Sequence, residues 1–197
     1  MSEEKRLKSV PENWSHRLVL SAVPKDGEPF EENFSLSADA PIDYWAQLYK
    51  LIKPLDVDVE ASRVNGRLLV QIKIATEAET LCSRCLEPAR VAINGELRYL
   101  YSLRPDEHTD EENEYGQDGE AGLILLDSWE DEIDLSGPIW EVLITSLPSR
   151  ALCSENYRGL CPQCGANLNK VTCGCKTDDA DPRFDVLRSA MKNERND

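Results

Sequence analysis

Seven cysteines, four of them within fifteen residues, constrain this chain more than any other feature of its sequence. The four lie in the stretch GLCPQCGANLNKVTCGC, at Cys161, Cys164, Cys173 and Cys175. Two thiolates separated by two residues can bind one ion from a single turn, and a second pair after a short loop completes a tetrahedral set. Soft thiolate ligands select zinc over hard cations. The spacing therefore predicts a structural Zn²⁺ site in a small Cys-rich module.

The other three cysteines are Cys82, Cys85 and Cys153. Cys82 and Cys85 form a second CxxC motif, but two thiolates alone cannot close a tetrahedral site. Three interpretations stay open: the pair joins Cys153 at a metal, recruits one ligand from the C-terminal module, or remains reduced at a strand turn. Cys153 is also an alternative ligand beside Cys161 and Cys164, if only one sulfur of the CxC pair binds. A redox role ranks last, because the flanking pattern predicts β-turns and not the βαβ context of a thioredoxin-like motif.

The N-terminal stretch and the hydropathy pattern predict a cytoplasmic protein. The first fourteen residues, MSEEKRLKSVPENW, contain charges and no apolar region of a signal peptide. No apolar run approaches the roughly 18–20 residues that a membrane span needs. In the cytoplasm thiols stay reduced, so paired cysteines indicate metal ligands or redox groups. The odd number of cysteines also argues against complete disulfide pairing.

The net charge of −15 is concentrated in one part of the chain. Residues 106–134 contain thirteen Asp and Glu and no Lys or Arg, and the rest of the chain has a net charge of −2. The expectation is that residues 105–121 form a mobile, solvated loop. The alternative is that the acidic run contacts a basic partner, or a basic surface of the same chain. The Cys-bearing segments are weakly basic, and their candidate partner-binding or RNA-binding residues are Arg84, Arg90, Arg158 and Lys170.

Alternating apolar residues predict the strands. Residues 55–64 and 67–81 alternate around Asn65–Gly66, and Asn-Gly is the strongest short hairpin signal because both residues tolerate positive φ. A second Asn-Gly, at 94–95, predicts another strand pair within 89–103. The Cys82–Cys85 motif is expected at a knuckle turn between strands. Further strands are predicted at 16–23 and 31–37, around the KDGE turn, and at 123–129.

Helical spacing of apolar residues predicts three short helices, at 40–52, 136–147 and 182–193. Pro54 and Pro148 end the first two of these helices. The fold class is therefore α+β, with an antiparallel, meander-like β-sheet body, a few short helices and a small C-terminal Cys-rich zinc-knuckle module. The predicted divisions are the body at 1–148, the Cys-rich module at 149–176, and a polar linker with a short terminal helix at 177–197.

No sequence motif points to catalysis. The chain lacks the GxGxxG, Walker and GxSxG motifs, and its two histidines, His16 and His108, are far apart in sequence. Without a nucleophile beside a base, the sequence predicts a protein that is not an enzyme.

Several segments in order resemble the YceD family, the large ribosomal RNA subunit accumulation proteins. The resemblance covers about residue 55 to the C-terminus. It is carried by CSRCLEP after a strand, then ILLDSWEDEIDL, LPSRALC after a helix, GLCPQCGANLN followed by CGC, and finally DPRFDVLRSAM. These pieces together are far more specific than either CxxC motif alone.

The resemblance implies a bacterial-type cytoplasmic factor needed for 23S ribosomal RNA accumulation or large-subunit maturation, with no catalytic activity. Its partner would be a ribosomal protein, an rRNA-processing factor or 23S rRNA. Relatives with the Cys-rich tail often carry a cysteine four positions after the one matching Cys153, where this chain has Tyr157. That departure favours Cys161, Cys164, Cys173 and Cys175 as the complete ligand set. The other functions kept open are a zinc-stabilised adaptor with a non-ribosomal partner and a CxxC redox protein.

Overall fold

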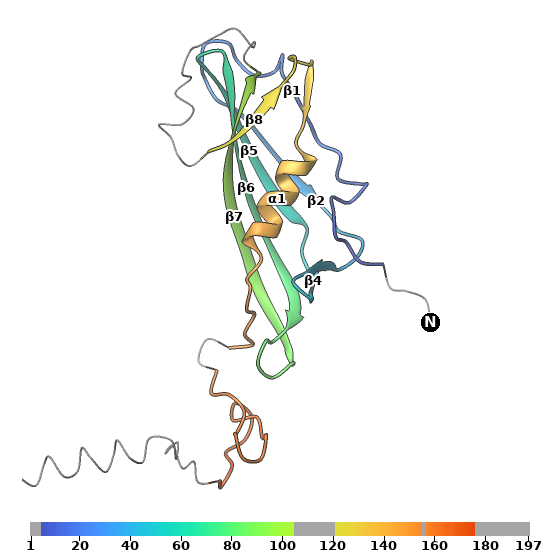
Figure 1. Ribbon diagram of the computed structural model, residues 1–197, viewed down its shortest axis with the longest axis vertical. Coiled ribbons are helices and arrows are strands. Elements are labelled where there is room, and N and C mark those ends of the chain that lie inside the picture. The colour runs from blue at the N-terminus through green and yellow to red at the C-terminus, as the bar shows by residue number, and fades with distance from the viewer. Residues whose placement is uncertain (1–4, 105–120, 155–156, 176–197) are drawn as a thin grey trace, which may run out of the picture. The chain divides into compact units, whose positions relative to one another are not determined.

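The computed structural model describes residues 5–104, 121–154 and 157–175 (Figure 1). The chain divides into two compact units, the first unit (Met1–Cys153) and the second unit (Ser154–Asp197). Residues 105–120 of the predicted acidic loop, and the predicted terminal helix, lie outside the described residues. The elements are β1 (Arg17–Val19), β2 (Phe30–Leu36), β3 (Ile42–Tyr44), β4 (Gln47–Leu51), β5 (Leu55–Val64), β6 (Arg67–Leu81), β7 (Pro88–Leu103), β8 (Ala121–Leu126), β9 (Glu132–Asp134) and α1 (Ser136–Ser146).

A seven-stranded sheet is the framework of the first unit. β5, β6 and β7 follow one another as an antiparallel meander, and β2 extends it by pairing with β5. β4 pairs with β6 on the edge that β5 also uses, further along the strand, and β3 pairs with β4. β8 is parallel to β7, while β1 and β9 form a separate two-stranded sheet. The prediction of a mostly antiparallel sheet is confirmed, with β8 as the parallel exception.

The β5–β6 hairpin forms where the sequence predicts it. Asn65 and Gly66 have φ angles of 49° and 75°, the left-handed pair that a two-residue turn requires. Side chains at alternate positions along β5, beginning with Leu55, Val57 and Val59, are buried, and those between them are exposed. An antiparallel sheet with one face in the core and one in water produces this alternation.

Helix α1 covers the buried face of the sheet across β6 and β7 (Figure 1). Its Ile139, Val142 and Leu143 are fully buried in the core. The prediction of this helix is confirmed, and α1 is the single α-helix within the described part of the chain.

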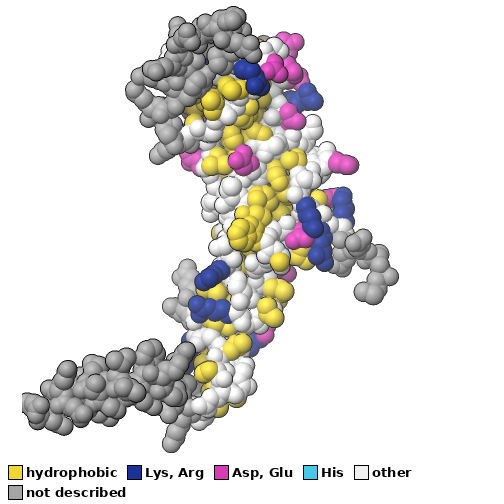
Figure 2. Space-filling view, in the orientation of Figure 1, with side chains coloured by type: hydrophobic (Ala, Val, Ile, Leu, Met, Phe, Trp, Pro, Cys, Tyr) yellow, Lys and Arg dark blue, Asp and Glu magenta, His cyan; other side chains and the backbone are white. Residues whose placement is uncertain are grey.

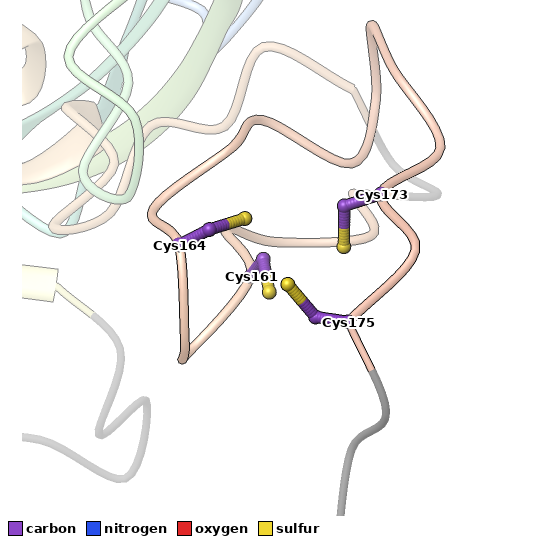
Figure 3. Close-up of side chains that lie close together, drawn as sticks. All are labelled: Cys161, Cys164, Cys173 and Cys175. Atoms are coloured by element: carbon purple, nitrogen blue, oxygen red, sulfur yellow. The ribbon is translucent and has the colours of Figure 1, made fainter.

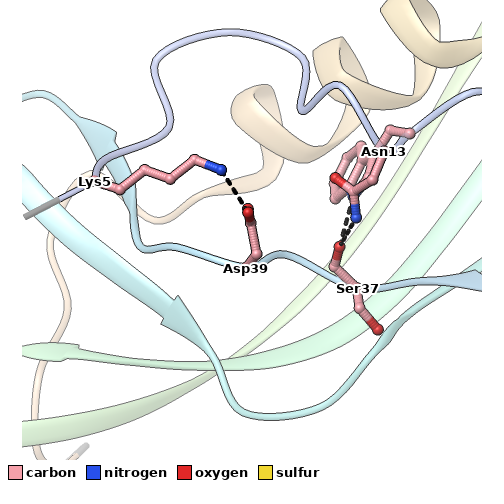
Figure 4. Close-up of polar contacts among 5 residues, drawn as sticks. Lys5, Asn13, Ser37 and Asp39 are labelled. Carbon is pink, nitrogen blue, oxygen red and sulfur yellow. Dashed lines mark hydrogen bonds and ion pairs between the residues drawn. The ribbon is translucent and has the colours of Figure 1, made fainter.

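An N-terminal segment is fixed to the loop between β2 and β3 (Figure 4). The Trp14 indole Nε1 and the Asn13 side-chain Nδ2 both donate to the carbonyl of Ser37, at 3.0 and 3.1 Å. Lys5 Nζ lies 2.5 Å from a carboxylate oxygen of Asp39. Trp14 is buried and packs edge-on against Trp140 of α1, with ring centroids 5.8 Å apart. This segment therefore closes one side of the core.

The helix predicted at 40–52 is wrong, because these residues form the β3–β4 hairpin. Ile42 pairs with Tyr49, and both side chains are buried. β4 then occupies the part of the β6 edge that β5 leaves free, with Lys50 opposite Glu79. Pairing with an exposed strand edge outweighs a helical pattern of apolar residues, since secondary-structure propensity is weak against tertiary context. Similarly, β1 and β2 form as predicted strands but pair with β9 and β5, and not with each other.

The turn predicted at Asn94–Gly95 is also wrong, because β7 runs without interruption from Pro88 to Leu103. Asn94 and Gly95 pair with Ala75 and Ile74 of β6 in regular register. A Cβ atom at Gly95 would lie 1.9 Å from Ser146 Oγ and 2.9 Å from Ser146 Cβ. The glycine therefore allows the end of α1 to approach the strand closely.

Replacing Gly95 by alanine is expected to destabilise the first unit by roughly 1–3 kcal/mol, the usual cost of overpacking a filled site. Urea denaturation measures the change. The matched control is Gly122→Ala in β8, where the nearest atom to a new Cβ is a Tyr99 ring carbon at 3.5 Å, an ordinary contact. Equal stability of the two variants would show that Gly95 has no packing role, and a Ser146→Gly change should partly rescue Gly95→Ala.

Candidate metal centres

Four cysteine side chains of the second unit converge on one point. The sulfur atoms of Cys161, Cys164, Cys173 and Cys175 lie within 4.8 Å of one another. Figure 3 shows the four side chains pointing inward from a loop that returns on itself. Cys161 is buried, Cys173 and Cys175 are partly buried, and Cys164 is exposed. This cluster can hold a metal ion with four thiolate ligands.

The Cys161–Cys164 turn is built by its backbone. The Gly165 N–H donates to the Cys161 carbonyl at 2.9 Å, and the Cys161 N–H donates to the Ala166 carbonyl at 2.8 Å. Gly165 has a φ of 71°, which glycine adopts without steric cost. The turn places both sulfurs on the same side of the loop, so the sequence CPQCG itself forms half of the cluster.

Electrostatics in this cluster favour a cation. Backbone N–H groups of Cys164 and Gln163 donate to the Cys161 sulfur and lower the pKa of this thiol to about 6. Hydrogen bonds from Cys175 to Cys164 and Cys161 raise the pKa of the Cys175 thiol to about 12. One thiolate is thus stabilised by the backbone, and its negative charge opposes ionisation of its neighbour. A divalent cation would remove that opposition and let all the sulfurs ionise.

The other three cysteines form a second cluster, inside the first unit. The sulfur atoms of Cys82, Cys85 and Cys153 also lie within 4.8 Å of one another, and those of Cys85 and Cys153 are 3.7 Å apart. Burial alone would raise the pKa of the Cys82 thiol. Backbone N–H groups of Cys85, Arg84 and Cys153 donate to its sulfur and outweigh burial, so the pKa is lowered to about 6. This cluster can also hold a metal ion.

The first unit brings Cys153 to the CxxC turn through the chain that follows α1. The Tyr49 hydroxyl donates to the Pro148 carbonyl at 2.5 Å, and the Ser83 N–H donates to the Ala151 carbonyl at 2.8 Å. Ala151 is buried. These contacts fix the segment leading to Cys153 against the end of the β6–β7 hairpin, so cysteines 68 residues apart in sequence meet.

The structure separates the seven cysteines into the two groups that sequence spacing left unresolved. Cys153 lies with Cys82 and Cys85, which was one of the open interpretations, and the predicted knuckle turn at Cys82–Cys85 lies between β6 and β7. The weakly basic candidates fall into different units: Arg84 and Arg90 lie on the first, and Arg158 and Lys170 on the second. Their part in binding stays a prediction.

Sequence reasoning missed one feature of the first unit, the β3–β4 turn at Trp45–Ala46. Both residues have positive φ, 51° and 60°, and Trp45 is 83% exposed. The sequence offers no Gly or Asn to signal such a turn. The available signal for a strand was the apolar pair Tyr49 and Leu51 on one face, with the charged Lys50 between them on the other.

The described part of the chain contains no helix long and apolar enough to cross a membrane.

Residues 70–189 match the family described as "Large ribosomal RNA subunit accumulation protein YceD". The chain belongs to the YceD family. The match begins in β6 and covers both cysteine clusters. The predicted family resemblance is therefore confirmed, and it places both clusters in the segment that defines the YceD family.

Several longer proteins are similar to this chain. An uncharacterised protein of Mycobacterium tuberculosis is 33% identical over 133 residues, covering 68% of this chain and 60% of the relative. An Arabidopsis thaliana protein named "Large ribosomal RNA subunit accumulation protein YCED homolog 1, chloroplastic" is 28% identical over 152 residues, covering 68% and 47%. A Zea mays protein of the same name is 31% identical over 143 residues, covering 62% and 49%. The chain thus spans 47% to 60% of the length of these relatives. No solved structure matches it.

Removing metal is expected to loosen the second unit, because its described residues bury little else. Tyr157 and Cys161 are its only buried side chains in 157–175, and Leu160 and Val171 are about half exposed. Limited trypsin digestion followed by mass spectrometry tests this. Adding a chelator to zinc-loaded protein should accelerate cleavage after Arg158 and Lys170 at least severalfold.

The double variant Cys161→Ala/Cys164→Ala, which keeps only two of the four thiolates, should be cleaved rapidly at the same two sites with or without chelator. Cleavage after Arg67, at the β5–β6 turn of the first unit, serves as the internal control. Equal cleavage rates at Arg158 and Lys170 in loaded and chelated protein would contradict a structural metal in this unit.

Proposed function

We propose that this chain is a non-enzymatic cytoplasmic factor that supports 23S ribosomal RNA accumulation, and so the biogenesis of the large ribosomal subunit. The family match over residues 70–189 carries this proposal, because the family description and the plant relatives' names refer to large ribosomal RNA subunit accumulation. The chain would act by binding a ribosomal protein, a processing factor or rRNA.

The metal in this proposal is Zn²⁺ in a structural role. Four thiolates with no open position are the usual ligand set of a structural zinc ion. The cluster of Cys161, Cys164, Cys173 and Cys175 supports this assignment, since its sulfurs already lie within 4.8 Å of one another. The ion would hold the second unit folded and would take no part in a reaction.

The contacts of the histidine at residue 16 give it a packing role. The His16 ring stacks on Phe34 with centroids 3.7 Å apart, and its Nε2 lies 3.2 Å from a Glu32 carboxylate oxygen. These contacts hold the ring at the side of β2, where it fixes packing. No catalytic role is needed to explain the position of His16, and these contacts fit a binding protein.

The best partner surface is an apolar groove where the β3–β4 turn meets the end of the β6–β7 hairpin. It has a volume of about 570 Å³. Its apolar lining includes Pro41, Trp45, Leu48, Leu81, Leu86 and Pro88. Trp45 is 83% exposed and Leu86 is 71% exposed. Large, exposed apolar side chains gathered in one groove mark an interaction site more often than a random part of the surface.

Backbone strain strengthens the case for this groove. Trp45, Ala46 and Leu86 all have φ angles between 51° and 60°, a left-handed conformation that costs a residue with a side chain roughly 1–2 kcal/mol. The Gln47 side-chain Nε2 donates to the Leu81 carbonyl at 2.6 Å and ties the two strained turns together. Strain held in exposed apolar residues is typical of sites where another molecule binds.

The composition of the groove favours a protein partner over RNA. Its charged lining residues are Arg6, Lys50 and Glu79, and Arg6 also lies 3.9 Å from Asp43. Tight phosphate binding requires clustered Lys and Arg, because counterion release drives it. On the face shown in Figure 2, Lys and Arg lie in small separate groups, several of them beside Asp or Glu. The partner we infer is a protein that inserts apolar side chains into the groove. The net charge of −13 on residues 106–134 favours a partner that also has a basic surface.

Depleting this protein from its native source is expected to lower 23S rRNA relative to 16S rRNA. Wild-type protein should restore the ratio, and Trp45→Ala should fail to, because truncating a central aromatic anchor often costs about 2 kcal/mol or more of binding free energy. Val64→Ala, which truncates a 44% exposed apolar residue at the end of β5, is the matched control and should restore the ratio.

The two parts of the proposal fail separately. An unchanged 23S to 16S ratio after depletion would contradict the role in rRNA accumulation. Full restoration by Trp45→Ala would contradict the groove while leaving that role standing. Co-sedimentation of the purified protein with large-subunit precursors tests the groove contact, because Trp45→Ala should weaken it at every salt concentration, whereas a phosphate contact would weaken steeply between about 50 and 200 mM salt and would not depend on Trp45.

A further inference from the structure

The two CxxC motifs, 79 positions apart in sequence, adopt the same turn. In the first, the Leu86 N–H donates to the Cys82 carbonyl at 3.0 Å, and the Cys82 N–H donates to the Glu87 carbonyl at 2.8 Å. In the second, Gly165 and Ala166 stand in the places of Leu86 and Glu87, with distances of 2.9 and 2.8 Å. The residue after the second cysteine is left-handed in both, at 59° and 71°.

The sulfur of the first cysteine accepts equivalent backbone hydrogen bonds in the two turns. The N–H groups two and three residues further on donate to it: Arg84 and Cys85 to Cys82, and Gln163 and Cys164 to Cys161. Backbone N–H groups directed at a sulfur stabilise a thiolate and are normal around metal-bound cysteine. The first turn keeps this geometry although Leu86, unlike Gly165, adopts a left-handed φ at a steric cost. A turn maintained against such a cost has the form of a metal-binding knuckle.

The first turn has one further protein ligand within reach. Cys153 Sγ lies 3.7 Å from Cys85 Sγ, and its backbone N–H adds a third donor to the Cys82 sulfur. Within the described part of the chain, the Cys, His, Asp and Glu side chains that come together at this point are Cys82, Cys85 and Cys153. Cys82 is buried, Cys85 partly buried and Cys153 exposed, so the cluster opens to solvent on the side of Cys153.

We propose that Cys82, Cys85 and Cys153 form a second metal site, separate from the four-cysteine site. It binds a soft divalent cation such as Zn²⁺ through three thiolates and leaves a fourth coordination position for an exchangeable ligand. Zinc is four-coordinate in nearly all protein sites, so an ion held by three cysteines takes its last ligand from water or from a donor such as imidazole or a thiol. This proposal stands independently of any role in rRNA accumulation.

Cobalt titration of the full-length, reduced, metal-free protein tests the proposal, because Co²⁺ occupies zinc sites and its absorption reports thiolate ligands and coordination. Wild-type protein should bind about two Co²⁺ ions per chain, one in each cluster. Cys153→Ala and the double variant Cys161→Ala/Cys164→Ala should each bind about one ion, the first at the four-cysteine site and the second at the three-cysteine site. Circular dichroism checks folding; Cys153 is exposed, so its truncation removes no core contact.

The fourth position has its own readout. Added imidazole should change the d–d absorption of Co²⁺ bound to the Cys161→Ala/Cys164→Ala variant, whose three-cysteine site is intact, and should leave the four-thiolate spectrum of Cys153→Ala unchanged. A wild-type stoichiometry of one, or a Cys153→Ala variant that still binds two ions, would overturn the second site. A Cys161→Ala/Cys164→Ala spectrum insensitive to imidazole would overturn the exchangeable position.

Discussion

The pairing of β6 with β7 is the interaction on which the rest of the first unit depends. It runs in unbroken register from Leu68 opposite Tyr101 to Leu81 opposite Pro88. The other edge of β6 accepts β5 and then β4, and the outer edge of β7 accepts β8. The buried face of this long hairpin forms one side of the core. The turn that joins its two strands contains Cys82 and Cys85. One pairing thus sets the position of the helix, the groove and one cysteine cluster.

Helix α1 links the core to the chemistry of the cysteines. Gly95 lets the end of the helix approach β7, and the chain leaving the helix is then tied to β4 at Pro148 and to the CxxC turn at Ala151. Cys153 reaches its partners because of these contacts. The same region presents the strained residues Trp45 and Leu86. A metal ion at this end of the hairpin would therefore also fix one wall of the proposed partner groove, since Cys82 and Leu86 both line it.

The sequence predicted correctly those features that depend on a short stretch of chain. The Asn65–Gly66 turn, helix α1 and the four-cysteine spacing each lie within one short stretch, where turn chemistry or periodicity is sufficient. The failures all concern contacts between distant segments. Asn94–Gly95 has the sequence of a turn but lies in a strand under a helix, and 40–52 has a helical pattern but pairs with the edge of β6. The grouping of Cys153 with Cys82 likewise depends on how α1 packs, which no spacing rule contains.

We propose that each cysteine cluster holds a metal ion that orders only its own surroundings, on a fold whose sheet forms without metal. Hydrogen–deuterium exchange of the full-length protein, zinc-loaded and chelated, tests this. Amide exchange should become faster after chelation around Cys82–Cys85 and throughout the described part of the second unit, and should stay unchanged in the centres of β5 and β6. Unchanged exchange at both CxxC turns, or a loss of protection across the whole sheet, would contradict it.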